Sequence, residues 1–289
     1  MIPLSGRSWR LARECWQLPR GGAVMGILNV TPDSFSDGGM HTGVESAVAH
    51  ARKLVAAGAD IVDIGGESTR PGAAEVDAAE EERRVLPVII ALRAEMPELR
   101  ISIDTRHAAV ARAALHAGAD VVNDITGLAD PEMRAVCAEF PCGVVLMHMQ
   151  GTPQTMQLSP HYDDVVAEVR SFFEARVAQA QAAGIAPERI CLDPGIGFGK
   201  NVEHNLALIR GLESLRVQDC PLLMALSRKR FLGALWGDAE FARRSALPTV
   251  VMSLQAAECG ADIHRVHDVD ELRRALLLRE SVYSSNNLN

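Results

Sequence analysis

The chain has 289 residues and a formal net charge of −8 at pH 7, an acidic balance that argues against binding nucleic acid through phosphate contacts. Hydrophobic residues make up 48% of the sequence, enough for a sizeable core, whereas the 4% of aromatic residues disfavour stacking on bases. No apolar run approaches the roughly 20 residues of a membrane-spanning helix, and we expect no signal peptide. The six cysteines are scattered and form no C-x-x-C motif, which indicates free thiols in a reducing cytoplasm.

Short apolar runs alternate with Ala-rich amphipathic runs along the chain. The apolar runs predict eight strands, at residues 23–30, 59–65, 100–105, 119–125, 143–148, 189–194, 221–226 and 261–267. The amphipathic runs between them predict long helices, for example at 44–58, 80–95, 107–118 and 162–184. Several of these helices end in glycine just before the next strand, which is typical of a helix C-cap.

The predicted strands are apolar throughout, so both of their faces are covered. Repeated strand–helix units in a chain of this length favour a single-domain (β/α)8 TIM barrel, with an open doubly wound sheet as the alternative. We expect the barrel to occupy residues 23–281. An N-terminal extension (1–22) precedes it, and a disordered tail (282–289) follows.

Polar residues stand near the carboxyl end of every predicted strand, where TIM barrels carry their chemistry. They are Asn29, Asp63, Asp104, Asn123 with Asp124, His148, Asp193, the segment 227–229, and His264, Arg265 and His267. A single such aspartate often only caps the following helix or loop. Buried polar groups at all eight ends need partners, however, and we interpret them as converging on one ligand.

The kinds of side chain indicate the ligand. Carboxylate and amide edges at Asp104, Asn123 and Asp193 match the N–H donors and ring nitrogens of a flat heterocycle such as an aminopyrimidinone. The cationic groups follow the last two strands, where many TIM barrels bind phosphate. The sequence therefore predicts a heterocycle on one side of the mouth and a phosphate group on the other.

Two polar loops and two motifs bear on the same site. The loop after residue 30 carries an aromatic residue and is expected to close over a ligand, whereas "GGESTRPG" at 65–72 is either an ordinary turn or a second ligand-gripping loop. "GIGFGK" at 195–200 lacks the spacing of a nucleotide phosphate loop. The histidines form no zinc motif, whereas a Mg²⁺ ion held by Asn29 and a substrate phosphate suits oxygen ligands.

Eight blocks in order between residues 24 and 269 resemble the dihydropteroate synthase family of folate biosynthesis. The blocks are GILNVTPDSFSDGG, DIGGESTRPGA, SIDT, NDITG, MHMQGTPQTMQ, LDPGIGFGK, SRK and RVHDV. The first two are highly specific, whereas SRK alone would be weak. The resemblance implies a TIM barrel, a homodimer, and a transferase that joins 6-hydroxymethyl-7,8-dihydropterin diphosphate to 4-aminobenzoate with Mg²⁺, giving 7,8-dihydropteroate and diphosphate. It also implies that sulfonamides compete with 4-aminobenzoate.

The resemblance assigns roles to individual residues. It implies Asn29 as the Mg²⁺ ligand and Asp104, Lys229, Arg265 and His267 as the catalytic groups. The implied pterin pocket is Asp104, Asn123, Asp193 and Lys229, and the implied diphosphate contacts are Thr69, Arg265 and His267. The implied neighbourhood of the aminobenzoate is Phe35, Arg70, Pro71, Phe198 and Lys229.

The sequence also departs from the family pattern. Ala225 and Leu226 precede SRK where a glycine and a small residue are frequent, and Arg230 stands where a small hydroxyl residue is common. His264 replaces an apolar residue, and we expect it to face outward with its hydrogen bonds satisfied. The alternatives are a methyltetrahydrofolate-binding methyltransferase and a pterin-binding protein without catalysis, and diphosphate release separates both from a synthase.

Overall fold

The computed structural model describes residues 6–30, 39–67 and 75–283. Phe35, Thr69, Arg70 and Pro71, all assigned to the site by resemblance, lie outside the described residues. Within the described ranges, every helix is too short or too polar to cross a membrane.

Eight parallel strands form a closed barrel, which confirms the predicted fold. The strands are β3 (Ala23–Asn29), β4 (Ile61–Gly65), β5 (Arg100–Asp104), β6 (Val121–Asp124), β7 (Gly143–Met147), β8 (Ile190–Asp193), β9 (Leu223–Met224) and β10 (Ile263–Val266). Their order around the sheet is β8-β7-β6-β5-β4-β3-β10-β9. A parallel bridge between Leu192 and Leu222 closes the ring between β8 and β9. Each predicted strand has an observed counterpart, of which β9 is the shortest.

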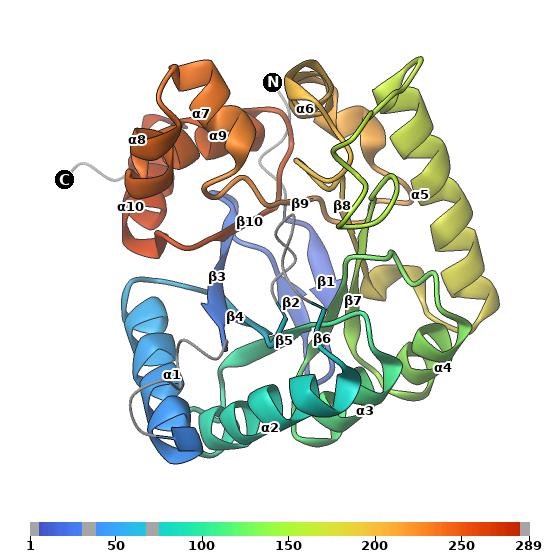
Figure 1. Ribbon diagram of the computed structural model, residues 1–289, viewed down its shortest axis with the longest axis vertical. Coiled ribbons are helices and arrows are strands. Elements are labelled where there is room, and N and C mark those ends of the chain that lie inside the picture. Colours follow the sequence, from blue (N-terminus) through green and yellow to red (C-terminus); the bar gives the residue numbers. More distant parts are fainter. Residues whose placement is uncertain (1–5, 31–38, 68–74, 284–289) are drawn as a thin grey trace.

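Helices surround these strands (Figure 1). They are α1 (Gly39–Ala56), α2 (Ala78–Glu95), α3 (Ala108–His116), α4 (Pro131–Glu139), α5 (Val165–Ala182), α6 (Val202–Arg210), α7 (Arg230–Trp236), α8 (Ala239–Arg244), α9 (Leu247–Glu258) and α10 (Val269–Tyr283). Two short 3₁₀ turns, η2 (Pro187–Arg189) and η3 (Leu212–Leu215), precede β8 and β9. Helix α10 continues for two residues past residue 281, where we expected the barrel to end.

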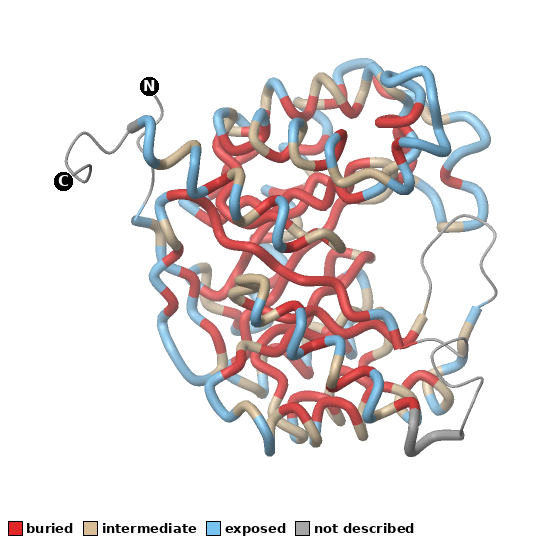
Figure 2. Tube along the Cα trace, turned by 90° about the vertical axis from the view of Figure 1, so that its left-hand side faces the viewer, coloured by how far each residue is buried: buried red, intermediate tan, exposed pale blue. Residues whose placement is uncertain are grey.

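The strands separate two hydrophobic layers, because successive side chains point to opposite faces. Val62 and Ile64 of β4 and Ile101 and Ile103 of β5 face outward and pack against the helices. A smaller inner cluster fills the barrel and includes Met25, Ile61, Val121, Val145, Cys191, Leu223 and Ile263. Figure 2 shows the resulting band of buried chain through the centre of the molecule.

A hairpin that sequence reasoning missed closes the amino end of the barrel. Strands β1 (Ser8–Arg10) and β2 (Cys15–Gln17) pair antiparallel, and Trp9 and Trp16 join the inner cluster. The Trp9 indole donates to Arg189 O at 2.8 Å. At Gly143 an added Cβ would lie 2.9 Å from a Leu11 methyl carbon, so glycine is needed for this approach. With the amino end filled, the inward-facing side chains are accessible to a ligand from the carboxyl end.

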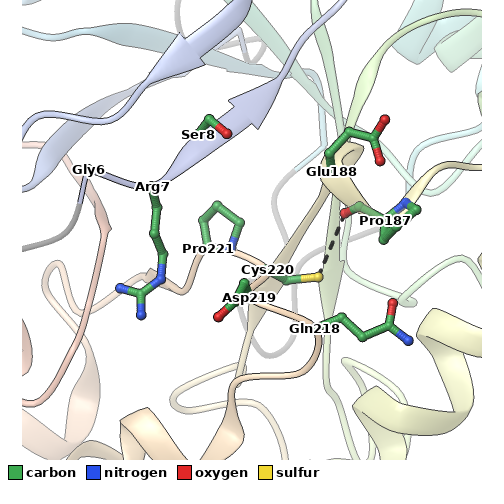
Figure 3. A pocket seen from close by; sticks show the side chains of 9 residues that line it. All are labelled: Gly6, Arg7, Ser8, Pro187, Glu188, Gln218, Asp219, Cys220 and Pro221. Carbon is green, nitrogen blue, oxygen red and sulfur yellow. Dashed lines mark hydrogen bonds between the residues drawn. The ribbon is translucent and has the colours of Figure 1, made fainter.

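A cavity of about 520 Å³ lies on this amino-terminal face (Figure 3). It is lined by the start of β1 and by the segments that precede β8 and β9. Gln218 and Asp219 form one wall with φ angles of 48° and 60°, and the Cys220 thiol donates to Pro187 O at 3.8 Å. Because TIM-barrel chemistry lies at the carboxyl ends of the strands, this cavity is separate from the candidate active site.

Candidate active site

Parallel register places the rim residues of β3 to β6 beside one another. Asn29 pairs with Gly65, Gly65 with Asp104, and Asp104 with Asn123. Because side chains alternate along a strand, residues paired in this way share one face of the sheet. The structure thus brings Asn29, Asp104 and Asn123 to one side of the barrel mouth.

Arg265 on β10 joins two acidic residues on neighbouring strands. Its Nε donates to Asp63 Oδ2 and its Nη2 donates to Asp104 Oδ2, both at 2.6 Å. The Asn123 amide also donates to Asp63 Oδ2, at 3.1 Å. Asp63 is fully buried, and its Oδ1 has no hydrogen-bond partner among the residues that the structure describes. Sequence reasoning noted Asp63 at a strand end but left it out of the site.

The charges in this network shift the pKa values of its members. Burial raises the pKa of Asp104 to about 7, Arg265 opposes the rise, and the carboxylate of Asp63 adds to it. Burial alone lowers the pKa of Arg265, but Asp63 and Asp104 outweigh it, so the net pKa is raised. The guanidinium therefore stays charged between two carboxylates, and the group carries net negative charge when both are ionised.

A second group forms across β8 and the start of α7. Asp193 is 3% exposed, and its Oδ1 accepts from the Gly195 amide at 2.7 Å. Burial raises the pKa of Asp193, against the opposing effects of the Gly195 amide and Lys229. The Lys229 ammonium lies 4.2 Å from the centre of the Phe198 ring, and burial lowers its pKa to about 8. This arrangement offers a carboxylate, a cation and an aromatic face in one place.

His267 is oriented by Ser227. The Ser227 hydroxyl oxygen lies 2.9 Å from His267 Nδ1 and accepts from the His267 backbone N–H at 3.1 Å. Because the oxygen already accepts from the backbone, its own proton can be donated to Nδ1, which favours the tautomer with the proton on Nε2. Ser227 was noted only as part of a strand end, and its contact with His267 could not be read from the sequence.

Asn29 is the one residue assigned to a metal. It ends β3, it is exposed, and its Oδ1 lies 3.9 Å from where a Cβ on Gly65 would stand. Among the described residues no group of three or more His, Cys, Asp or Glu side chains is placed to hold a metal ion. A single amide oxygen supplemented by substrate oxygens and water fits Mg²⁺, which keeps several waters and needs few protein ligands.

Two other polar strand residues do not face the mouth. Asp124 accepts from Thr126 N, Thr126 Oγ1 and Leu128 N at 2.8 to 3.0 Å, so it caps the turn after β6. His264 pairs in register with Val24, whose side chain belongs to the outer layer, and therefore faces outward as expected. Within the described ranges neither ring nitrogen of His264 has a hydrogen-bond partner, which contradicts the expectation that its bonds are satisfied. Burial lowers its pKa to about 4, which keeps the ring neutral.

The residues that depart from the family pattern lie in different parts of the barrel. Ala225 belongs to the inner cluster of the barrel, and Leu226 is fully buried in the outer layer. Arg230 is exposed on the first turn of α7. His148 follows β7, and its Nδ1 contacts the Lys200 ammonium. It does not join the group formed by Asp63, Asp104 and Arg265.

The chain is similar to known proteins over most of its length. A model described as pterin binding enzyme matches residues 25–267. Dihydropteroate synthase of Escherichia coli strain K12 is 48% identical over 262 residues, covering 91% of this chain and 92% of that protein. The structure of Xanthomonas albilineans dihydropteroate synthase with 4-aminobenzoic acid is 47% identical, covers 96% of this chain and 99% of its own, and has a TM-score of 0.88. The Yersinia pestis dihydropteroate synthase structure with a sulfonamide drug is 44% identical, covers 96% and 100%, and has a TM-score of 0.87.

Proposed function

The chain belongs to the dihydropteroate synthase family of pterin-binding enzymes, and from that premise we propose how its barrel mouth performs the reaction. The enzyme condenses 6-hydroxymethyl-7,8-dihydropterin diphosphate with 4-aminobenzoate, giving 7,8-dihydropteroate and diphosphate. The observation that carries the proposal is the bridge from Arg265 to Asp63 and Asp104, on the rim that also bears Asp193 and Lys229. The similarity to a dihydropteroate synthase extends over about nine-tenths of both chains. A methyltransferase or a non-catalytic pterin-binding protein would not explain this similarity.

The pterin ring binds between Asp104, Asn123 and Asp193. Asp193 keeps one carboxylate oxygen, Oδ2, outside the bond to Gly195, and this oxygen accepts N–H groups of the aminopyrimidinone edge. Asn123 is oriented by its bond to Asp63 and presents its amide oxygen to the same ring. Lys229 donates to the ring carbonyl or to N5.

The reaction begins at the CH₂ group that carries the diphosphate. Aniline nitrogen is a weak nucleophile, so the C–O bond breaks early and its electron pair leaves with the diphosphate oxygen. The positive charge that develops on the CH₂ group spreads into the pterin ring. Asp63 and Asp104 offset this charge, because two carboxylates share the single guanidinium of Arg265. The aminobenzoate nitrogen then forms the new C–N bond and loses its proton late, without a strong general base.

The departing diphosphate is held by Arg265, on β10, and by His267, which follows this strand. Nη1 of Arg265 makes no hydrogen bond within the described part of the chain and can donate to a phosphate oxygen. His267, oriented by Ser227, supplies a second donor. Asn29 would hold Mg²⁺ together with diphosphate oxygens. When bound, the ion neutralises charge on the leaving group.

The aminobenzoate lies against Phe198 and Lys229, which form a cation–π contact. The ring of the substrate packs on the aromatic side chain, and Phe35, Arg70 and Pro71 complete the pocket in this proposal. The Yersinia pestis dihydropteroate synthase forms a complex with a sulfonamide drug. We expect sulfonamides to bind here in place of 4-aminobenzoate and to inhibit competitively.

The enzyme acts as a homodimer through an apolar surface on α7, α8 and α9, which lie beside one another in Figure 1. The exposed residues of this surface are Leu235, Trp236, Phe241, Leu247 and Val251, each 38 to 50% exposed. Trp236 and Phe241 stack with their ring centres 5.1 Å apart. Contiguous exposed apolar patches mark protein interfaces. Trp236→Glu should convert a dimer to a monomer in sedimentation velocity, whereas Leu158→Glu, at an exposed leucine outside this surface, should not.

The cytoplasm is the proposed compartment, because all six cysteines are free thiols.

A diphosphate-release assay tests the proposed reaction. Diphosphate should appear only when both substrates and Mg²⁺ are present, and sulfonamide should raise the KM for 4-aminobenzoate without changing kcat. Release that is independent of 4-aminobenzoate, or noncompetitive inhibition, would contradict the proposal.

A further inference from the structure

Lys200 is buried directly after the glycine-rich loop 194–199. Only 3% of it is exposed. Its ammonium lies within hydrogen-bond distance of four acceptors: His148 Nδ1 and Phe198 O at 2.9 Å, Gly195 O at 3.1 Å and His148 O at 3.4 Å. An ammonium has three protons, so these acceptors use its whole donor capacity.

All four acceptors of this ammonium are neutral. No carboxylate forms an ion pair with Lys200 within the residues that the structure describes. Burial lowers the pKa of His148 to about 3, and Lys200 adds to the effect, so the imidazole is neutral and its Nδ1 can accept. Burial lowers the pKa of Lys200 to about 7, and the attraction of Asp193 opposes this fall. Three of the four acceptors are backbone carbonyl groups, so the direct contacts of Lys200 are mainly with the backbone that surrounds it.

The loop that Lys200 ties down packs directly against the end of β7. Gly195 and Gly199 have φ angles of 65° and 63°. A Cβ on Gly195 would lie 1.9 Å from His148 O, and one on Gly199 would lie 2.5 Å from Gln150 O. Carbonyl groups buried by such a close approach need hydrogen-bond partners. Lys200 bonds two of them from the loop and one from His148.

Two parts of the active site depend on this loop. Phe198, whose carbonyl accepts from Lys200, carries the ring that lies under the Lys229 ammonium. Gly195, whose carbonyl also accepts from Lys200, donates its amide to Asp193. Asp193 itself is the last residue of β8, where strand pairing fixes its backbone independently. Loss of Lys200 should therefore displace Phe198 more than Asp193.

We propose that Lys200 is a positioning residue for 4-aminobenzoate, acting by fixing Phe198 beneath Lys229. The inference rests on the proposed function, because it names the determinant of one substrate subsite in that reaction. The ammonium does not touch either substrate. It holds the carbonyl groups of residues 195 and 198 on one side and the end of β7 on the other, and so sets the plane on which the aminobenzoate ring packs.

A role confined to folding is the competing explanation, and Tyr162 provides the matched control. The Tyr162 hydroxyl donates to Gly199 O at 3.0 Å, so it also ties this loop to the body of the protein. Tyr162→Phe removes that bond but leaves the carbonyl groups of residues 195 and 198 bonded. If the loop needs only general support, Lys200→Met and Tyr162→Phe should have similar consequences.

The experiment compares the wild type, Lys200→Met and Tyr162→Phe in the full-length chain with Mg²⁺. The KM for 4-aminobenzoate is measured at saturating pterin diphosphate, the Kd for pterin diphosphate by calorimetry, and folding by thermal melting. Lys200→Met should raise the KM for 4-aminobenzoate at least tenfold and change the pterin Kd less than threefold. Tyr162→Phe should change both less than threefold. Unchanged KM in folded Lys200→Met, or equal losses for both substrates, would overturn the proposal.

Lys200→Gln keeps the test decisive if Lys200→Met does not fold. The shorter amide keeps a donor in the buried site but cannot bond the carbonyl groups of Gly195 and Phe198 together as the ammonium does. We expect the KM for 4-aminobenzoate to rise at least fivefold in this variant, with the pterin Kd changed less than threefold. An unchanged KM in folded Lys200→Gln overturns the proposal. A wild-type enzyme that releases no diphosphate from the two substrates would instead contradict the proposed function, before any variant is compared.

Discussion

Arg265 and Asp104, 161 residues apart in the chain, are joined by a 2.6 Å hydrogen bond between guanidinium Nη2 and carboxylate Oδ2. The same guanidinium binds Asp63 through Nε. The closure of the barrel creates this contact, since β10 pairs with β3, β3 with β4 and β4 with β5. The ion pairs of Arg265 stabilise the fold, and the two carboxylates place negative charge near the reacting carbon of the substrate.

Replacing Arg265 should destabilise the protein. Arg265→Met leaves Asp63, which is fully buried, without its counter-ion. Removing one partner of a buried ion pair costs about 3–5 kcal/mol. Urea denaturation monitored by circular dichroism measures the loss, with Arg52→Met as the control at the exposed pair with Glu95, where no measurable change is expected. A stability equal to that of the wild type would show that the acidic pair does not need the guanidinium.

Asp104→Asn should reduce turnover more than binding. The amide keeps the shape of the side chain and removes the charge that offsets the developing cation. Removing one preorganised electrostatic contact lowers kcat by about 100-fold or more. Rapid-quench kinetics and calorimetry of pterin diphosphate provide the two values. A large loss of pterin affinity with normal kcat would assign Asp104 to ground-state binding alone.

The pH dependence of kcat/KM should be a narrow bell. Burial raises the pKa of Asp104 to about 7, so the carboxylate is protonated and activity falls as the pH drops below that value. Burial lowers the pKa of Lys229 to about 8, so the ammonium loses its proton and activity falls as the pH rises above that value. Lys229→Arg should remove the basic limb and keep the acidic one. A flat profile from well below pH 7 to well above pH 8 would contradict both assignments.

Trp9→Ala should separate stability from activity. Trp9 is fully buried at the amino end of the barrel and hydrogen-bonded to Arg189 O. Large-to-small changes at buried tryptophan cost about 3–5 kcal/mol. The hairpin lies at the end of the barrel opposite the active site, so the KM values for both substrates should be unchanged in the folded variant. Altered KM values would mean that the hairpin shapes the mouth as well.

The sequence was sufficient for the barrel, because periodicity and helix capping are local. Eight apolar runs separated by helical runs predict the strand order of a closed parallel sheet, and each run has an observed strand. The hairpin was missed because each of its strands has only three residues, too few for any period to appear. Helix α4 shows such a local signal, because Asp130 caps it and Pro131 begins it, which is a recognisable helix start.

The site was predictable by position but not by contact. A polar residue at a strand end predicts where a side chain lies, and Asp104, Asn123 and Asp193 do lie at the mouth. Which of them share a guanidinium depends on strand register and on the direction of each side chain, and neither can be read from residue types. Asp63 was left out of the predicted site for that reason, since its partners Asn123 and Arg265 are 60 and 202 residues away in the sequence.

The most direct test of the charge-offset account is a secondary deuterium isotope effect. The pterin diphosphate is labelled as CD₂ at the reacting carbon, and a single turnover with 4-aminobenzoate is followed by diphosphate release. If the C–O bond breaks early beside Asp63 and Asp104, the reacting carbon becomes planar and the deuterated substrate should react measurably more slowly. Equal rates for the two substrates would indicate a tight displacement and would contradict stabilisation of a positive CH₂ centre by this acidic pair.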